Sequence, residues 1–164
     1  MNSKPKAYHY TVTKLLNQIF NDGYIKPATA IVPKHERPVV WLSMNPFWEE
    51  TAYKSYFQNG VMTSLNRQQT HDKFGGLARI EVPFHITSSW NNFKKKSGIL
   101  KSHADALASV AINRGTSPKQ WRVSYGPISE SNWIGVELFN WESQMWEPHR
   151  YAKFPGGGGS LDKI

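Results

Sequence analysis

Residues 8–25 constrain the fold more than any other part of the chain. The stretch opens with Tyr8-His9-Tyr10-Thr11, which has the character of a short strand. Apolar residues then recur at i, i+3, i+4, i+7 and i+8, the pattern of a helix with one buried face. Asn21-Asp22-Gly23 ends that helix, because glycine readily adopts the left-handed conformation that follows a helix. The sequence therefore predicts a strand that carries a histidine and is backed by an amphipathic helix.

A second unit follows the same plan. Residues 39–43 form an apolar strand, and Asn45-Pro46 after it is typical of a helix cap and first turn. Glu49 and Glu50 would then lie where the helix dipole favours anions, and the helix is expected to run to about residue 57. Two strand ends with polar groups, each backed by a helix, are one way to build a cleft.

The remainder of the chain is expected to be mostly β. Residues 58–76 are polar and indicate a loop, and helices are expected within 88–98 and 102–115. We therefore predict a single α+β domain over residues 1–154, with mixed or split β-sheets and flanking helices. The tail 155–164 contains four consecutive glycines and resembles a linker, so it is expected to be flexible and to lie outside the fold. Further strands are predicted at 77–84, 121–125 and 133–139, and a last short strand after a turn at 141–146.

Composition excludes several classes of chemistry. The 164 residues include no cysteine, so disulfides and thiolate sites are excluded. The six histidines show no metal-ligand spacing, and no phosphate-binding loop, dinucleotide glycine fingerprint or nucleophile elbow is present. We expect no metal site, no membrane span and no signal peptide, and therefore a cytoplasmic location.

Charge and aromatic content point to possible ligands. The net charge of +8 favours contact with a polyanion such as nucleic acid. Seven tryptophans, seven tyrosines and eight phenylalanines exceed the needs of a typical core, and flat rings hold planar ligands at low entropic cost. The basic residues are spread along the chain except for the run 94–96.

The strand ends supply the candidate binding residues. His9 is either a hydrogen-bonded core histidine or a group that faces a ligand. Trp41 and Ser43 share one face of their strand, because side chains alternate with period two, and together could stack on and hydrogen-bond to a flat heterocycle. Asn45 is explained by capping alone. Tyr53 lies twelve residues after Trp41 and could fold back over the strand end.

Three glutamates are candidates for a catalytic carboxylate. Glu137 lies within the predicted strand 133–139, where a carboxylate is costly unless it is paired or faces a cleft. Glu130 precedes that strand and is its rival. Glu81 has Arg79 on its own strand face as an expected ion-pair partner. A structural role is open for each of the three.

Taken together, the His-Tyr-Thr strand, the helix ending in Asp-Gly-Tyr-Ile and the aromatic-x-Ser strand end resemble the ADP-ribosyltransferase superfamily. The similarity is greatest to the branch with a His, Tyr, Glu signature, which includes diphtheria-type toxins and poly(ADP-ribose) polymerases. It covers roughly residues 8–57, with one late-strand glutamate beyond them. Tyr10 stands where the family usually has glycine, and Trp41 where it usually has tyrosine. The segment 36–54 also resembles a family of bacterial and phage proteins of unknown activity.

The resemblance implies an ADP-ribosyltransferase-like fold that cleaves the nicotinamide–ribose bond of NAD. The enzyme would transfer ADP-ribose to a nucleic-acid or protein acceptor, or act as an NAD glycohydrolase. In that picture a carboxylate stabilises an oxocarbenium-like transition state. The resemblance implies that the His9 ring contacts the adenosine ribose and that the Tyr10 backbone holds the nicotinamide amide, with Thr11 completing that motif. The other implied residues are Trp41 and Tyr53 around the nicotinamide ring, Ser43 next to the ring, and Glu137 or Glu130 as the catalytic carboxylate.

Two other functions remain open from the sequence. One is a non-enzymatic nucleic-acid-binding module, and the other is a small phage or bacterial inhibitor that binds one protein. The nucleic-acid module would surround exposed aromatics with cations. Its expected residues are Trp90, Phe93, Lys94, Lys95, Lys96, Lys101, Arg114, Lys119 and Arg122.

Overall fold

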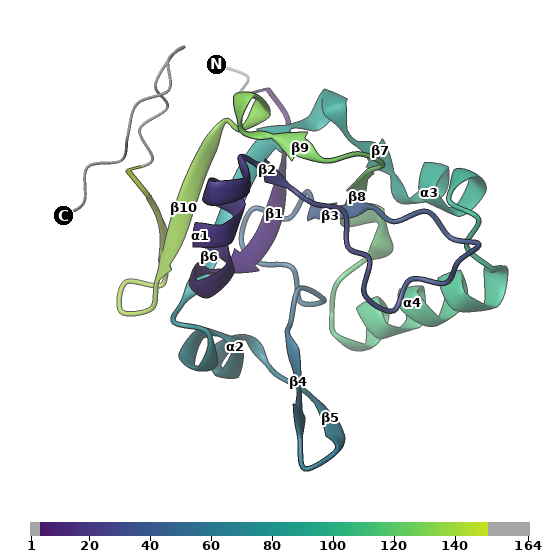
Figure 1. Cartoon of the computed structure of the whole chain (residues 1–164), viewed down its shortest axis with the longest axis horizontal. Helices are drawn as coiled ribbons and strands as arrows, with labels where there is room; N and C mark the ends of the chain where they lie inside the picture. Colours follow the sequence, from purple (N-terminus) through teal and green to yellow (C-terminus); the bar gives the residue numbers. More distant parts are fainter. Residues whose placement is uncertain (1–3, 151–164) are drawn as a thin grey trace.

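The computed structural model describes residues 4–150, so the glycine-rich tail lies outside the described residues. One antiparallel sheet of seven strands organises the molecule (Figure 1). Across the sheet the strands are β11 (Met145–Pro148), β10 (Gly135–Asn140), β6 (Leu77–Pro83), β1 (Lys6–Val12), β3 (Val40–Ser43), β8 (Trp121–Ser124) and β7 (Ser88–Ser89).

Two small sheets and seven helical segments surround this sheet. β2 (Tyr24–Ile25) pairs with β9 (Ile128–Ser129), and β4 (Ser55–Gln58) pairs with β5 (Val61–Ser64). The helical segments of the described residues are α1 (Thr13–Asp22), α2 (Arg67–Lys73), η1 (Phe84–Ile86), α3 (Trp90–Lys96), α4 (Lys101–Asn113), η2 (Pro118–Gln120) and η3 (Glu130–Asn132). The predicted α+β class is confirmed, although every strand pair in the described range is antiparallel rather than mixed.

The first strand–helix unit forms as predicted. α1 ends at Gly23, whose φ of 73° allows its N–H to bond the carbonyls of Ile19 and Phe20. α1 lies over β1 and β6 (Figure 1), and its Leu16 is buried against Ile80 and Val136 in one core cluster. Leu16, Ile19 and Phe20 of the predicted apolar face therefore join the core, while Leu15 is 39 % exposed.

The second predicted helix, from residue 46 to residue 57, is wrong. Residues 44–51 make bends and turns, and β4 begins at Ser55. The Asn45 side chain accepts a hydrogen bond from the Phe47 N–H, and the Glu49 carboxylate accepts one from the Thr51 N–H. Short polar side chains that bond to nearby backbone in this way compete with helix formation.

The loop predicted for residues 58–76 also contains regular structure. Asn59 and Gly60 both have positive φ, which makes the tight turn between β4 and β5. α2 follows, and Asn66 and Gln69 form its capping box. This β4–β5 hairpin projects away from the main sheet (Figure 1).

The two faces of the main sheet bury different side chains. The register pairs Tyr8 with Ser43 and Tyr10 with Arg79, so these four side chains share one face, called here the aromatic face. His9 and Thr11 point to the opposite face, which packs against α1 and is called the helix face. Aromatic residues fill two clusters on the aromatic face: Tyr10, Trp48, Phe139, Trp141 and Trp146 in one, and Trp41, Trp90, Phe93 and Trp121 in the other.

Candidate functional site

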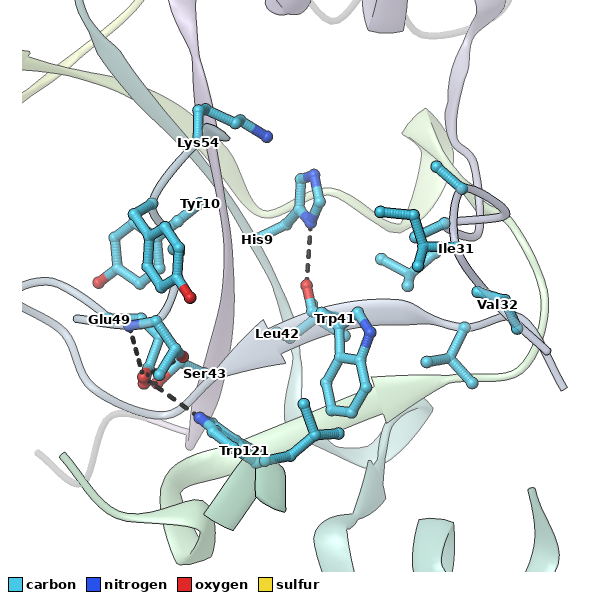
Figure 2. A pocket seen from close by; sticks show the side chains of 18 of the residues that line it. His9, Tyr10, Ile31, Val32, Trp41, Leu42, Ser43, Glu49, Lys54 and Trp121 are labelled. Carbon is cyan, nitrogen blue, oxygen red and sulfur yellow. Dashed lines mark hydrogen bonds between the residues drawn. The ribbon is translucent and has the colours of Figure 1, made fainter. Parts of the chain in front are cut away.

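A cavity of about 470 Å³ opens where β1 and β3 separate (Figure 2). β1 pairs with β6 over its whole length, but its pairing with β3 is recorded only at Tyr8 and Ser43. Beyond that point the two strands leave a gap that side chains fill. The walls come from β1, the loop 26–36, β3, the segment 49–54, α4 and Trp121.

The loop 26–36 is held firmly against the rest of the molecule. Ala28 forms a β-bridge with Val39, and the Arg37 N–H bonds the Ser97 carbonyl at 2.7 Å. Gly98 lets the chain approach closely, since a Cβ there would lie 2.1 Å from the carbonyl oxygen of His35. At the cavity rim Ile31 is 89 % exposed with φ of 63°, a strained conformation for a β-branched residue.

His9 fills the gap between the two strands. Its Nδ1 lies 2.9 Å from the carbonyl oxygen of Trp41, and a carbonyl can only accept, so Nδ1 carries the hydrogen. The pKa of His9 is lowered to about 4, mainly by burial and to a smaller degree by nearby Lys54, while the hydrogen bond to the Trp41 carbonyl acts in the opposite direction. The ring is therefore neutral at pH 7, and Nε2 presents a free lone pair.

Lys54 lies close to His9 in the cavity wall. Desolvation by burial lowers the pKa of its amine. In Figure 2 the amine and the His9 ring lie on the same side of the Trp41 carbonyl. Among the described residues, no side-chain hydrogen bond or ion pair reaches the Lys54 amine.

Glu49 supplies the carboxylate of the cavity. It is 5 % exposed and accepts hydrogen bonds from Ser43 Oγ at 2.7 Å and from Trp121 Nε1 at 3.2 Å. The Thr51 hydroxyl, at 2.7 Å, and the Thr51 N–H add two more bonds. Several donors to one carboxylate hold it in one orientation.

The turn that carries Glu49 is fixed from the aromatic face. Three side chains donate to three successive carbonyls: Tyr10 Oη to Asn45, Arg79 to Pro46, and Trp146 Nε1 to Phe47 at 2.7 Å. We call this set the carbonyl clamp. Since Glu49 follows two residues later, the clamp holds the start of the turn that places its carboxylate.

The binding residues predicted from the sequence do not all lie in the same place. His9, Tyr10, Trp41, Ser43 and Tyr53 all line the cavity. Asn45 does not: its side chain accepts from the Phe47 N–H, so it organises a turn rather than capping a helix. Thr11 is buried and lines a smaller cavity of about 200 Å³ on the helix face.

The resemblance implies that His9 and Trp41 contact the same NAD molecule, but their rings lie on different sides of the sheet. The register puts them on opposite faces of the sheet. Trp41 contributes its carbonyl to His9, while its ring packs edge-on against Phe93 and Trp121. Tyr53 keeps a place in the cavity wall, with the Arg114 guanidinium 3.6 Å from the centre of its ring. A nicotinamide sandwiched between Trp41 and Tyr53 is therefore incompatible with this packing.

Neither predicted catalytic glutamate lies in the cavity. Glu137 is on β10, two strands away from β1, and pairs with Arg79 on the aromatic face. Glu130 begins η3, next to the β2–β9 pair. Glu81 is paired with Lys6 at 2.8 Å rather than with Arg79. Glu137 lies outside the cavity because of the strand register. Glu137 on β10 is paired with Arg79 on β6, so both side chains lie on the aromatic face.

Sequence reasoning missed Glu49 and Lys54 as site residues. Glu49 was assigned to the first turn of a helix that does not form, and nothing in the local pattern marks its side chain as buried. Lys54 lies one residue after Tyr53, and only the fold shows that its amine is drawn into the cavity. The remaining signal was weak: a serine at a strand end with a glutamate six residues later.

No protein-family model, curated protein or solved structure matches this chain. The site is therefore interpreted from its own geometry. Within residues 4–150, no three His, Asp or Glu side chains come together in a way that could hold a metal ion. The helices of this range are too short or too polar to span a membrane.

Proposed function

We propose that the cavity binds NAD and cleaves its nicotinamide–ribose bond, with Glu49 as the carboxylate that stabilises the transition state. The observation that carries the proposal is that one cavity is lined by His9, Ser43, Tyr53 and an anchored buried glutamate. The first three are residues that the resemblance to ADP-ribosyltransferases implies. Glu49 takes the role first assigned to Glu137 or Glu130. An ADP-ribosyltransferase-like fold is part of the same proposal.

The cavity suits such a ligand in size and in lining. Its volume of about 470 Å³ is within the usual range for small-molecule sites. Apolar side chains from the loop 26–36 and from α4 line one part, and the polar groups lie on β1, β3 and the segment 49–54. Tyr53 is the aromatic residue left to contact the nicotinamide ring, because the Trp41 ring packs elsewhere.

In the proposed reaction the bond between the ribose carbon and the nicotinamide nitrogen breaks. The electron pair leaves with neutral nicotinamide, and the ribose becomes an oxocarbenium-like cation. The Glu49 carboxylate stabilises this cation, and because Ser43, Thr51 and Trp121 already orient it, little reorganisation is needed during the reaction. Water or an acceptor nucleophile then bonds to the ribose carbon and loses a proton to solvent.

The acceptor is proposed to be a macromolecule, with nucleic acid favoured by charge. Lys94, Lys95 and Lys96 form an exposed basic end of α3, and the net charge is +8. The non-enzymatic nucleic-acid module is less well supported, because Trp90 and Phe93 are buried in the core rather than exposed for stacking.

Release of free nicotinamide from NAD, followed by chromatography, tests the proposal. We expect release by the wild-type protein and a loss of at least 100-fold in Glu49→Gln, because the neutral amide cannot stabilise the cation. Glu130→Gln is the matched control and should keep wild-type activity. No release of nicotinamide at millimolar NAD, whether or not calorimetry detects binding, would refute the proposed cleavage. Loss of activity in Glu130→Gln but not in Glu49→Gln would refute the assignment of the carboxylate.

A further inference from the structure

Lys54 lies where two cavities adjoin. The 470 Å³ cavity and the 200 Å³ cavity on the helix face have three lining residues in common, His9, Lys26 and Lys54. An elongated ligand that occupied both cavities would therefore pass its middle between these side chains.

The two lysines at this junction differ in their partners. Lys26 is half exposed and pairs with Asp22 at 2.8 Å. Lys54 is partly buried in the cavity wall, and no carboxylate among the described residues pairs with it. A buried ammonium without a counter-charge is unfavourable in the free protein, and an anion placed beside it removes that cost. Lys54 is thus a ready binding group rather than part of an internal ion pair.

His9 offers a ligand at this position one ring nitrogen only. Its Nδ1 is committed to the Trp41 carbonyl, so only Nε2 is available to a ligand. Nε2 can accept a hydrogen bond from a ligand hydroxyl, or bind an anion after taking up a proton. Glu49, the negative group of the cavity, bonds to Ser43, Thr51 and Trp121 instead of Lys54.

We propose that the junction between Lys54 and His9 is a phosphate site that takes the diphosphate of a nucleotide, with the two nucleoside ends in the two cavities. A dinucleotide has this layout, since its phosphates lie in the middle and its sugars and bases at the ends. The proposal rests on the proposed function in its choice of a dinucleotide, but the phosphate site is testable with ADP, which has no nicotinamide to release.

Calorimetric titration with ADP and with adenosine tests the site. Wild-type protein should bind ADP at least 10-fold more tightly than adenosine. Lys54→Met, which keeps the length of the side chain, should weaken ADP binding at least 10-fold and leave adenosine binding unchanged. Lys54→Arg should recover part of the ADP affinity. Lys101→Met is the control and should change ADP affinity by less than 3-fold, because Lys101 pairs with Asp105 and lines neither cavity.

The outcomes separate the site from the reaction. Tight ADP binding that depends on Lys54, without nicotinamide release from NAD, supports the phosphate site and refutes the proposed function. Nicotinamide release with the same KM for NAD in wild type and Lys54→Met refutes the phosphate site alone. Three further results would overturn the phosphate site. They are equal binding of ADP and adenosine, no ADP binding at millimolar concentration, and ADP binding that Lys54→Met does not weaken. Inorganic pyrophosphate as a competitor distinguishes recognition of the phosphates from recognition of the nucleoside, and we expect it to displace ADP.

Discussion

The cavity junction and the carbonyl clamp both bury a cation, but only one of them leaves that cation without partners. On the aromatic face, Arg79 bonds to Glu137 and to the Pro46 carbonyl, and lies 4.5 Å from the ring centre of Tyr8. At the junction, no carboxylate, carbonyl or ring within residues 4–150 is found to contact the Lys54 amine in this way. A buried charge whose partners are internal holds the fold together, whereas one without partners is available to a ligand.

The same contrast explains why Glu137 was a poor choice of catalytic residue. A carboxylate inside a strand must be paired or must face a cleft, and the sequence alone left both possibilities open. The structure shows pairing with Arg79. Glu49 differs, because its four hydrogen bonds come from neutral donors and no cation pairs with it among the described residues.

The largest expected effect is on the clamp. Arg79→Met should lower the free energy of unfolding by about 3–5 kcal/mol, because it leaves Glu137 without its partner and releases the Pro46 carbonyl. Urea denaturation measures this. Lys101→Met is the control, since Lys101 and Asp105 form an exposed pair that contributes little to stability. A loss below about 1 kcal/mol in Arg79→Met would show that Arg79 does not hold the fold together, and the contrast with Lys54 would fail.

Local signals predicted the elements whose geometry depends on neighbours in sequence. Gly23 ends α1, and the strand predicted at 77–84 forms β6, which is buried on both of its faces. The helix after Asn45 failed because a tertiary demand won: Glu49 is drawn to Trp121, seventy-two residues away. His9 was found because a strand-end histidine is visible in the sequence. Its partner was not, since contact with the Trp41 carbonyl depends on how β1 and β3 separate.

The next largest effect is the dependence of the free energy of unfolding on pH, which His9 causes. Its pKa is about 4 in the folded protein and about 6.5 when exposed, so the unfolded chain binds more protons between these values. The free energy of unfolding should be unaffected above pH 7, and should fall as the pH drops from about 6.5 to about 4. The expected contribution is about 3 kcal/mol.

Comparison with His9→Gln isolates this contribution from the carboxylates that titrate in the same range. Thermal unfolding of both proteins at pH 7 and pH 4.5 should show a larger loss for the wild type. Parallel curves would mean that His9 is protonated as easily in the folded protein as in the unfolded chain, and that the junction is more open to water than its burial indicates.

A smaller effect of opposite sign is expected at Lys54. Lys54→Met removes a buried charge without a partner, so the ligand-free protein should gain about 1 kcal/mol in stability. Urea denaturation without nucleotide measures the change, with Lys26→Met as the control. A loss of stability in Lys54→Met would show that the amine has a structural role, and the contrast with Arg79 would fail.

The smallest effect tests whether every bond of the clamp matters equally. Trp146→Phe removes the donor to the Phe47 carbonyl but keeps an aromatic ring beside Arg79. Phe47 is exposed, so water can replace the lost donor, and the expected loss is about 0.5 kcal/mol, the low end for a neutral hydrogen bond. Tyr10→Phe removes the donor to the Asn45 carbonyl at a buried position and should cost more, about 1–1.5 kcal/mol. If the two losses of stability are equal, the contribution of a clamp hydrogen bond does not depend on its burial. All three donors would then hold the turn that carries Glu49 to the same extent.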